Sequence, residues 1–124
     1  MEMDLLDITE SRTLHEMFRD YLWETLQRKI IYAPWGFATY DVHQNYIFLA
    51  DLYIEPKLRG SGVCREFLLE LEEIAKAVNR SYIGTKVHTL DKAWQNNLAI
   101  CEHLGFRRAK VSPEYIFLMK RRGD

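Results

Sequence analysis

The sequence has few of the residues that build metal sites or disulfide frameworks. Only two cysteines, Cys64 and Cys101, occur among its 124 residues, and they match no metal-ligand spacing. Such sparse cysteine is typical of a reduced, intracellular protein. No apolar run reaches the length of a membrane span, and the acidic start of the sequence is unlike a signal peptide. These absences predict a cytoplasmic protein with no membrane partner and no metal.

An excess of charge of either sign is also absent. The chain carries 17 basic and 18 acidic side chains, for a net charge of −1. No overall field therefore draws the chain to nucleic acid or to an anionic membrane. The composition, 48% hydrophobic and 28% charged, is ordinary for a globular protein. The length predicts a single domain over residues 1–124.

The most informative stretch is a strand followed by a glycine turn and a helix. Residues 46–54 are apolar at nearly every position, which predicts a central strand covered on both faces. Pro56 ends the strand, and Gly60 and Gly62 form the turn. Apolar residues then recur at helical spacing up to Val78. A turn that opens a helix directs free backbone N–H groups and the positive helix end at one point, which suits a phosphate.

The other elements are predicted from periodicity and from turn residues at their ends. A capping box, Thr13 with Glu16, predicts the start of the first helix, with Thr9 and Ser11 as alternative starts. Asp91 caps the last helix, and Gly105 closes it. The strands at 46–54 and 81–87 are joined through a helix, so they should pair in parallel. Helices are predicted over residues 13–27, 63–78 and 92–103, and strands over 5–8, 29–32, 35–42, 46–54, 81–87, 106–111 and 115–120.

The glycine turn resembles the Arg/Gln-x-x-Gly-x-Gly/Ala signature of the GNAT superfamily of N-acetyltransferases. Arg59, Gly62 and Cys64 occupy its three defined positions, with cysteine where glycine or alanine is usual. Cysteine is small enough to keep the turn closely packed. The Leu-Gly-Phe sequence at residues 104–106 resembles the end of the family's closing helix, although Cys101 stands where a tyrosine is expected. The element order also matches, with one helix before the antiparallel strands where the family often has two.

The resemblance implies an α/β fold with a mixed, mostly antiparallel sheet and acetyl-CoA as co-substrate. In the family a parallel strand pair splays apart, and the pantetheine arm enters the gap. Strand backbone would then pair with pantetheine, the turn amides would hold the pyrophosphate, and Arg59 would add a charged donor. The residues that the resemblance assigns to acetyl-CoA are Leu52, Tyr53, Ile54, Arg59, Gly60, Ser61, Gly62, Val63, Cys64 and Asn97.

Candidate catalytic residues follow from the need to deprotonate an amine. Asp51 is the only charge inside the apolar run, so it is a candidate base; alternatively it satisfies backbone donors at a bulge where the strands part. His88 is a second candidate base. Cys101 either protonates the leaving thiolate or is a small core residue, and we favour the core interpretation. Tyr115, on the last hairpin, could replace the missing tyrosine from another direction.

The activity predicted by the resemblance is N-acetylation of a primary amine by direct attack in a ternary complex. Three classes of acceptor remain open: a small amine, an antibiotic-like polyamine, and a protein lysine or N-terminus. The alternative is a catalytically silent protein, either an acyl-CoA sensor or an interaction module, which the missing tyrosine favours. Members of the family often dimerise, so a homodimer is a further expectation, with no face identified.

Overall fold

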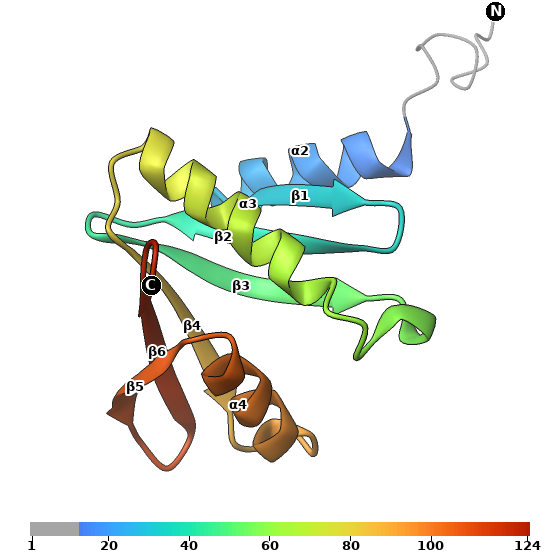
Figure 1. Cartoon of the computed structure of the whole chain (residues 1–124). Coiled ribbons are helices and arrows are strands. Elements are labelled where there is room, and N and C mark those ends of the chain that lie inside the picture. Colours follow the sequence, from blue (N-terminus) through green and yellow to red (C-terminus); the bar gives the residue numbers. More distant parts are fainter. Residues whose placement is uncertain (1–12) are drawn as a thin grey trace, which may run out of the picture.

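The computed structural model describes residues 13–124 and contains one mixed sheet. The strand predicted over residues 5–8 lies outside the described residues. Six strands pair in the order β1-β2-β3-β4-β6-β5 (Figure 1). The strands are β1 (Lys29–Ala33), β2 (Gly36–Val42), β3 (Tyr46–Ile54), β4 (Tyr82–His88), β5 (Arg107–Val111) and β6 (Tyr115–Arg121). The helices are α2 (Leu14–Leu26), α3 (Cys64–Ala77) and α4 (Trp94–His103), with a short 3-10 turn, η1 (Pro56–Leu58).

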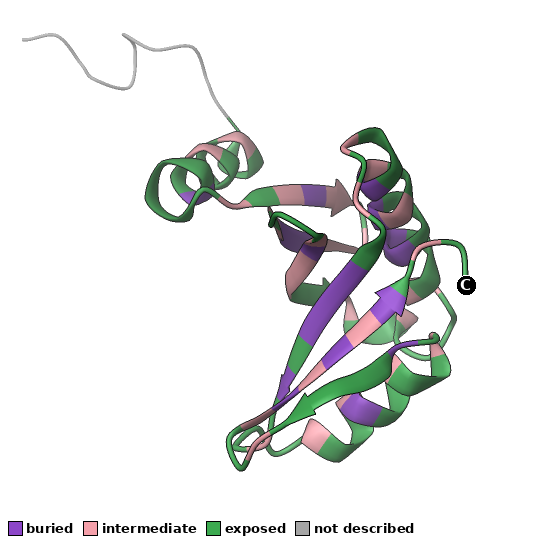
Figure 2. Cartoon of the chain, turned by 90° about the vertical axis from the view of Figure 1, so that its left-hand side faces the viewer, coloured by how far each residue is buried: buried purple, intermediate pink, exposed green. Residues whose placement is uncertain are grey.

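The sheet is antiparallel except for the parallel pair β3 and β4, as the sequence predicts. Helices α3 and α4 lie on one face, and α2 lies on the other (Figures 1 and 2). We call the face toward α3 and α4 the helical face and the opposite one the α2 face. The α/β fold with a mixed sheet is therefore confirmed. No helix between residues 13 and 124 is long and apolar enough to cross a membrane.

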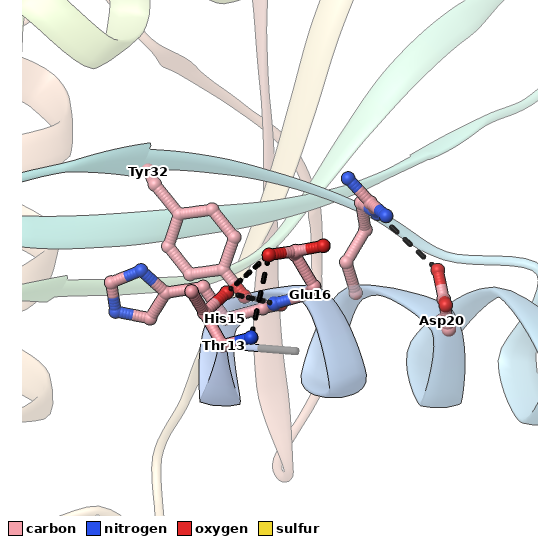
Figure 3. Close-up of polar contacts among 6 residues, drawn as sticks. Thr13, His15, Glu16, Asp20 and Tyr32 are labelled. Atoms are coloured by element: carbon pink, nitrogen blue, oxygen red, sulfur yellow. Dashed lines mark hydrogen bonds and ion pairs between the residues drawn. The ribbon is translucent and has the colours of Figure 1, made fainter. Parts of the chain in front are cut away.

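Helix α2 starts at the predicted capping box. The Glu16 N–H donates to the Thr13 hydroxyl oxygen (3.1 Å), and the Thr13 N–H donates to the Glu16 carboxylate (3.3 Å) (Figure 3). The Tyr32 hydroxyl donates to the His15 carbonyl (2.6 Å), and the two rings stack with centroids 4.4 Å apart. These contacts fix the first turn of α2 against β1.

The core lies between α3 and the helical face of the sheet. The apolar stripe predicted for this helix is confirmed, since its central residues are buried. Their partners on β3, β4 and β6 are fully covered. The α3 residues are Phe67, Leu68, Leu71 and Ala75, and the strand residues are Ile47, Ile83 and Leu118.

The prediction that β3 is covered on both faces is wrong for its second half. Ile47 is fully buried, whereas Asp51, Leu52 and Tyr53 are exposed. The reason is that the pairing of β3 with β4 ends at Leu49 and Thr85, so the rest of β3 has a neighbour on one side only. The apolar second half of the strand therefore lines an opening instead of a core.

The start of the last helix also differs from the prediction. Helix α4 begins at Trp94, not at Lys92, and has no side-chain N-cap. The Asp91 carboxylate accepts a hydrogen bond from the Ala93 N–H (3.0 Å) and so stabilises the turn that precedes the helix. Gly105 closes the helix with a positive φ of 102°, as predicted.

A buried ion pair ties α3 to β6. The Lys120 side chain is 4% exposed, and its Nζ lies 2.6 Å from Oε1 of Glu72, whose side chain is 15% exposed. We expect Glu72→Ala to lower the free energy of unfolding by about 3–5 kcal/mol, because it leaves a buried ammonium without its partner. Urea unfolding measures this loss. Glu73→Ala, at an exposed position of the same helix, should change little, and adding Lys120→Met should restore most of the loss. An equal loss of unfolding free energy in Glu72→Ala and Glu73→Ala would contradict a stabilising role of the ion pair.

Candidate active site

The opening between β3 and β4 continues into a cleft of about 1210 Å³. Beyond the last pair, Leu49 with Thr85, the two strands share no further pairing. The Thr85 hydroxyl donates to the Leu49 carbonyl (3.0 Å) and closes the ladder at this point. The cleft walls come from residues 49–54 of β3, residues 85–88 of β4, the glycine turn and α4. The splayed parallel pair that the family resemblance implies is thus present, and on β4 the gap begins after Thr85.

A β-bulge accompanies the separation of the strands. Thr39 pairs with Asp51 and Tyr40 pairs with Leu49, so Ala50 is an extra residue in β3. A bulge bends its strand and increases the local twist. It lies immediately beyond Leu49, the last β3 residue paired with β4. The bulge therefore turns the second half of β3 away from β4.

The glycine turn presents a group of unpaired backbone donors to the cleft. Gly60 and Gly62 have φ values of 81° and 90°, which residues with side chains rarely adopt. Helix α3 has no side-chain cap at Val63. Within residues 13–124, no acceptor receives a hydrogen bond from the N–H groups of Gly60, Gly62, Val63 and Cys64. Four free N–H groups at a helix N-terminus can bind an anion.

Two turn residues have structural contacts of their own. The Arg59 Nε donates to the Ile54 carbonyl (2.9 Å), and its guanidinium lies 5.5 Å from the Tyr53 ring centroid. These contacts hold Arg59 at the cleft wall and use one of its donors. The Ser61 hydroxyl donates to the Leu58 carbonyl (2.5 Å), and Ser61 does not line the cleft.

The α4 wall of the cleft carries Asn97 and Cys101. Cys101 also borders a small apolar cavity of about 50 Å³ that Cys64 lines from α3. Burial raises the pKa of the Cys101 thiol to about 11, with smaller contributions from Cys64 and Glu102. Burial also raises the pKa of Cys64. Both thiols therefore stay protonated at neutral pH, and Cys101 is a weaker acid than an ordinary thiol, whose pKa is ~8.5.

Asp51 lies on the α2 face, beside the gap. Its side chain is 58% exposed. The buried Thr39 hydroxyl donates to Asp51 Oδ2 (2.7 Å), and Arg28 Nη1 lies 3.8 Å from the same oxygen. No described backbone N–H donates to the Asp51 carboxylate, although the predicted bulge is present one residue earlier. The carboxylate is therefore held in place while Oδ1 accepts no hydrogen bond from residues 13–124.

Arg28 links Asp51 to a second carboxylate. Its Nε and Nη2 donate to the two oxygens of Asp41 at 2.8 and 3.0 Å. The hydrogen bond with Asp41 is the main cause of the raised pKa of Arg28, and burial opposes it. This bidentate pair fixes the guanidinium between the two carboxylates.

The remaining candidates lie on β4 and β6. His88 and Tyr115 are partners in the β4–β6 ladder, and both follow the alternation that points to the α2 face. His88 is exposed and lines the cleft, whereas Tyr115 does not line it. Lys86, two residues before His88, also lines the cleft. Lys86 was not among the residues predicted from the sequence, although a polar residue between the buried Thr85 and Val87 marks the exposed face of a strand.

The family assignment agrees with this geometry. The family model of the GNAT acetyltransferases matches residues 6–106. The chain belongs to the GNAT acetyltransferase family. No curated protein sequence matches it significantly.

Solved GNAT structures share the fold at low sequence identity. Nourseothricin acetyltransferase superposes with a TM-score of 0.67 at 13% identity, covering 78% of this chain and 66% of that one. The PaiA N-acetyltransferase from Thermoplasma acidophilum, solved with coenzyme A, superposes with a TM-score of 0.66 at 20% identity. The match covers 87% of this chain and 68% of that one. The ribosomal-protein-S18-alanine N-acetyltransferase of Escherichia coli superposes with a TM-score of 0.55 at 18% identity. The match covers 73% of this chain and 63% of that one. The chain spans about two thirds of the length of these three structures.

Proposed function

We propose that the chain is an N-acetyltransferase that transfers the acetyl group of acetyl-CoA to a primary amine. The observation that carries the proposal is the set of four unpaired N–H groups at Gly60, Gly62, Val63 and Cys64, at the mouth of a cleft between splayed strands. These groups suit the pyrophosphate of CoA. The edge of β3 at residues 52–54 that faces away from β2 has no strand partner and suits the amides of pantetheine, although the Ile54 carbonyl already accepts a hydrogen bond from Arg59. Asn97 on α4 borders the same cleft. A cytoplasmic location would give the enzyme access to acetyl-CoA.

The proposed reaction is one direct transfer. The lone pair of the neutral amine attacks the thioester carbonyl carbon, an N–C bond forms, and the C–S bond breaks. The nitrogen loses a proton, and the thiolate leaves as the anion and takes up a proton from solvent afterwards. A backbone N–H of the unpaired β3 edge is suited to stabilise the oxyanion that develops on the carbonyl oxygen.

Asp51 is the proposed acceptor of the proton from the amine. An alkylammonium with a pKa of ~10.4 costs about 4.6 kcal/mol to deprotonate at pH 7. A carboxylate beside the gap, reached directly or through water, lowers this cost. Thr39 and Arg28 fix Asp51 through one oxygen, so the other can face the ammonium. His88, on the opposite strand of the gap, is the second candidate base.

Cys101 fits the core interpretation better than the role of proton donor. A thiol with a pKa of about 11 is a weaker acid than the thiol of the leaving group. We expect Cys101→Ala to keep most of the activity, because a thiolate leaves without protonation. Steady-state rates at neutral pH measure this, with Cys64→Ala as a second thiol variant. A drop of about a hundredfold in kcat for Cys101→Ala alone would instead assign proton donation to Cys101.

The alternative function is that of a sensor that binds acyl-CoA without turnover. The observation that favours it is the partly buried, weakly acidic Cys101 at the position of the family's tyrosine. Turnover separates the two functions. Purified protein is incubated with acetyl-CoA and a panel of amines, peptides and proteins, and thiol release is followed together with product mass. Amide product beyond one equivalent supports the enzyme, whereas binding of acetyl-CoA without product supports the sensor.

A further inference from the structure

The α2 face beside the cleft carries two lysines around one aromatic ring. Lys86 Nζ lies 4.7 Å from the Tyr115 ring centroid and 6.0 Å from that of Phe48. Lys110 Nζ lies 5.9 Å from the same Tyr115 centroid. Phe48 belongs to β3, Lys86 to β4, Lys110 to β5 and Tyr115 to β6, so four strands build this cluster. We call Lys86, Lys110, Phe48 and Tyr115 the lysine cluster.

The positive charge of the lysine cluster has no neutralising partner among residues 13–124. Neither Lys86 nor Lys110 makes an ion pair with a described carboxylate. Both side chains are exposed, and the aromatic rings restrict where their ammonium groups lie. Two ammonium groups held near one ring repel each other, and a bound anion relieves that repulsion. An anion bound beside the two ammonium groups would therefore be stabilised there.

The position of Lys86 connects this site to the acyl-transfer site. Thr85 is the last β4 residue paired with β3, and Lys86 is the next residue along the strand. Lys86 therefore borders the gap from β4, and Asp51 borders it from β3. Both point to the α2 face, but no ion pair joins them. Opposite charges on the two sides of the gap suit a molecule that carries both a cation and an anion.

We propose that the acceptor is an amine that also bears a carboxylate, the class of free amino acids. This inference rests on the proposed acetyltransferase function. The ammonium group faces Asp51 and the gap, while the carboxylate binds Lys86 with support from Lys110. A polyamine, in contrast, brings a second cation to the lysine cluster and is repelled there. The lysine cluster thus selects among amines and takes no part in bond making.

The test compares each amino acid with the amine that lacks only its carboxylate. Phenylalanine is paired with phenethylamine, and lysine with cadaverine. We expect kcat/KM to favour the amino acid by roughly tenfold, the ratio that ~1.4 kcal/mol of differential binding produces. In Lys86→Gln this ratio should fall toward one. Comparing ratios between wild type and variant cancels the intrinsic reactivity of the amines. Lys29→Gln is the matched control, because Lys29 also lies over an aromatic ring, Trp23 (5.9 Å), but on β1.

The results of these assays support or overturn the proposed amino acid acceptor as follows. Acetylation of amines with an unchanged ratio in Lys86→Gln, or a preference for the decarboxylated amines, overturns it and leaves the acetyltransferase function standing. If no amine is acetylated, the proposed function fails, and binding of N-acetylphenylalanine then tests the anion site by calorimetry. Binding lost in Lys86→Gln and kept in Lys29→Gln supports the site. Binding that is absent in wild type, or equal in both variants, overturns it.

Discussion

Replacing Gly62 with aspartate should abolish measurable binding of acetyl-CoA. Gly62 has a φ of 90°, in a region that disfavours residues with side chains. The new carboxylate would also stand among the free N–H groups of Gly60, Val63 and Cys64 and would compete there with the pyrophosphate. We expect Kd to rise by at least about a hundredfold, because both the donor geometry and the charge are changed. Isothermal titration calorimetry with acetyl-CoA and with CoA measures the loss.

Gly123→Asp is the matched control for this variant. Gly123 has a φ of 86°, and no atom lies within 4 Å of a Cβ added at either glycine. The two substitutions therefore carry a similar backbone cost and the same charge. Gly123 follows β6 near the start of β4, whereas the cleft lies toward the end of β4. Equal loss of acetyl-CoA binding in both variants would contradict the assignment of the glycine turn to the pyrophosphate.

Asp51→Asn should lower kcat by about a hundredfold or more at neutral pH. Asparagine keeps an oxygen for the Thr39 hydroxyl, so the bulge and β3 should stay in place, while the proton acceptor is lost. Affinity for acetyl-CoA, measured by calorimetry, should stay near the wild-type value because the glycine turn is untouched. The loss in kcat should become smaller as pH rises toward the pKa of the amine, ~10.4, because the amine then loses its proton without a base.

Glu55→Gln is the control for Asp51→Asn, since it removes the same charge four residues further along the chain, after β3 ends. We expect kcat of Glu55→Gln to change by less than about threefold, because the removed charge acts only through screened electrostatics and transfers no proton. A pH-independent deficit in Asp51→Asn would mean that the carboxylate only supports the strand. An unchanged kcat would leave His88 as the remaining candidate base on this face.

Local signals in the sequence predict much of the fold. The bounds of β3 are predicted residue for residue, because polar residues precede its apolar run and Pro56 follows it closely. The capping box at Thr13 and the left-handed Gly105 are likewise found as predicted. The start of helix α4 is less predictable, because Asp91 is a residue type that often caps helices but here accepts a hydrogen bond in the turn before the helix. Helix boundaries depend on such competition between nearby backbone donors.

The candidate site is predictable only in part, because it depends on strand pairing. An apolar run does not show whether both neighbours of a strand continue beside it, so the exposure of Leu52 and Tyr53 follows from the family resemblance and not from the run itself. The glycine turn is local in sequence and is predicted well. Lys86, Lys110 and Tyr115 come together from three strands through the registers of two ladders. A single sequence contains no signal that these three residues lie close together.

The most direct test of this account is an amide-resolved NMR titration of the labelled protein with CoA and, separately, with pantetheine. We predict that CoA shifts the amide resonances of Gly60, Gly62, Val63 and Cys64 far more than pantetheine does, because only CoA carries the pyrophosphate. Both ligands should shift the amides of residues 51–54, along the unpaired edge of β3. CoA binding that leaves the four turn amides unshifted would contradict the account.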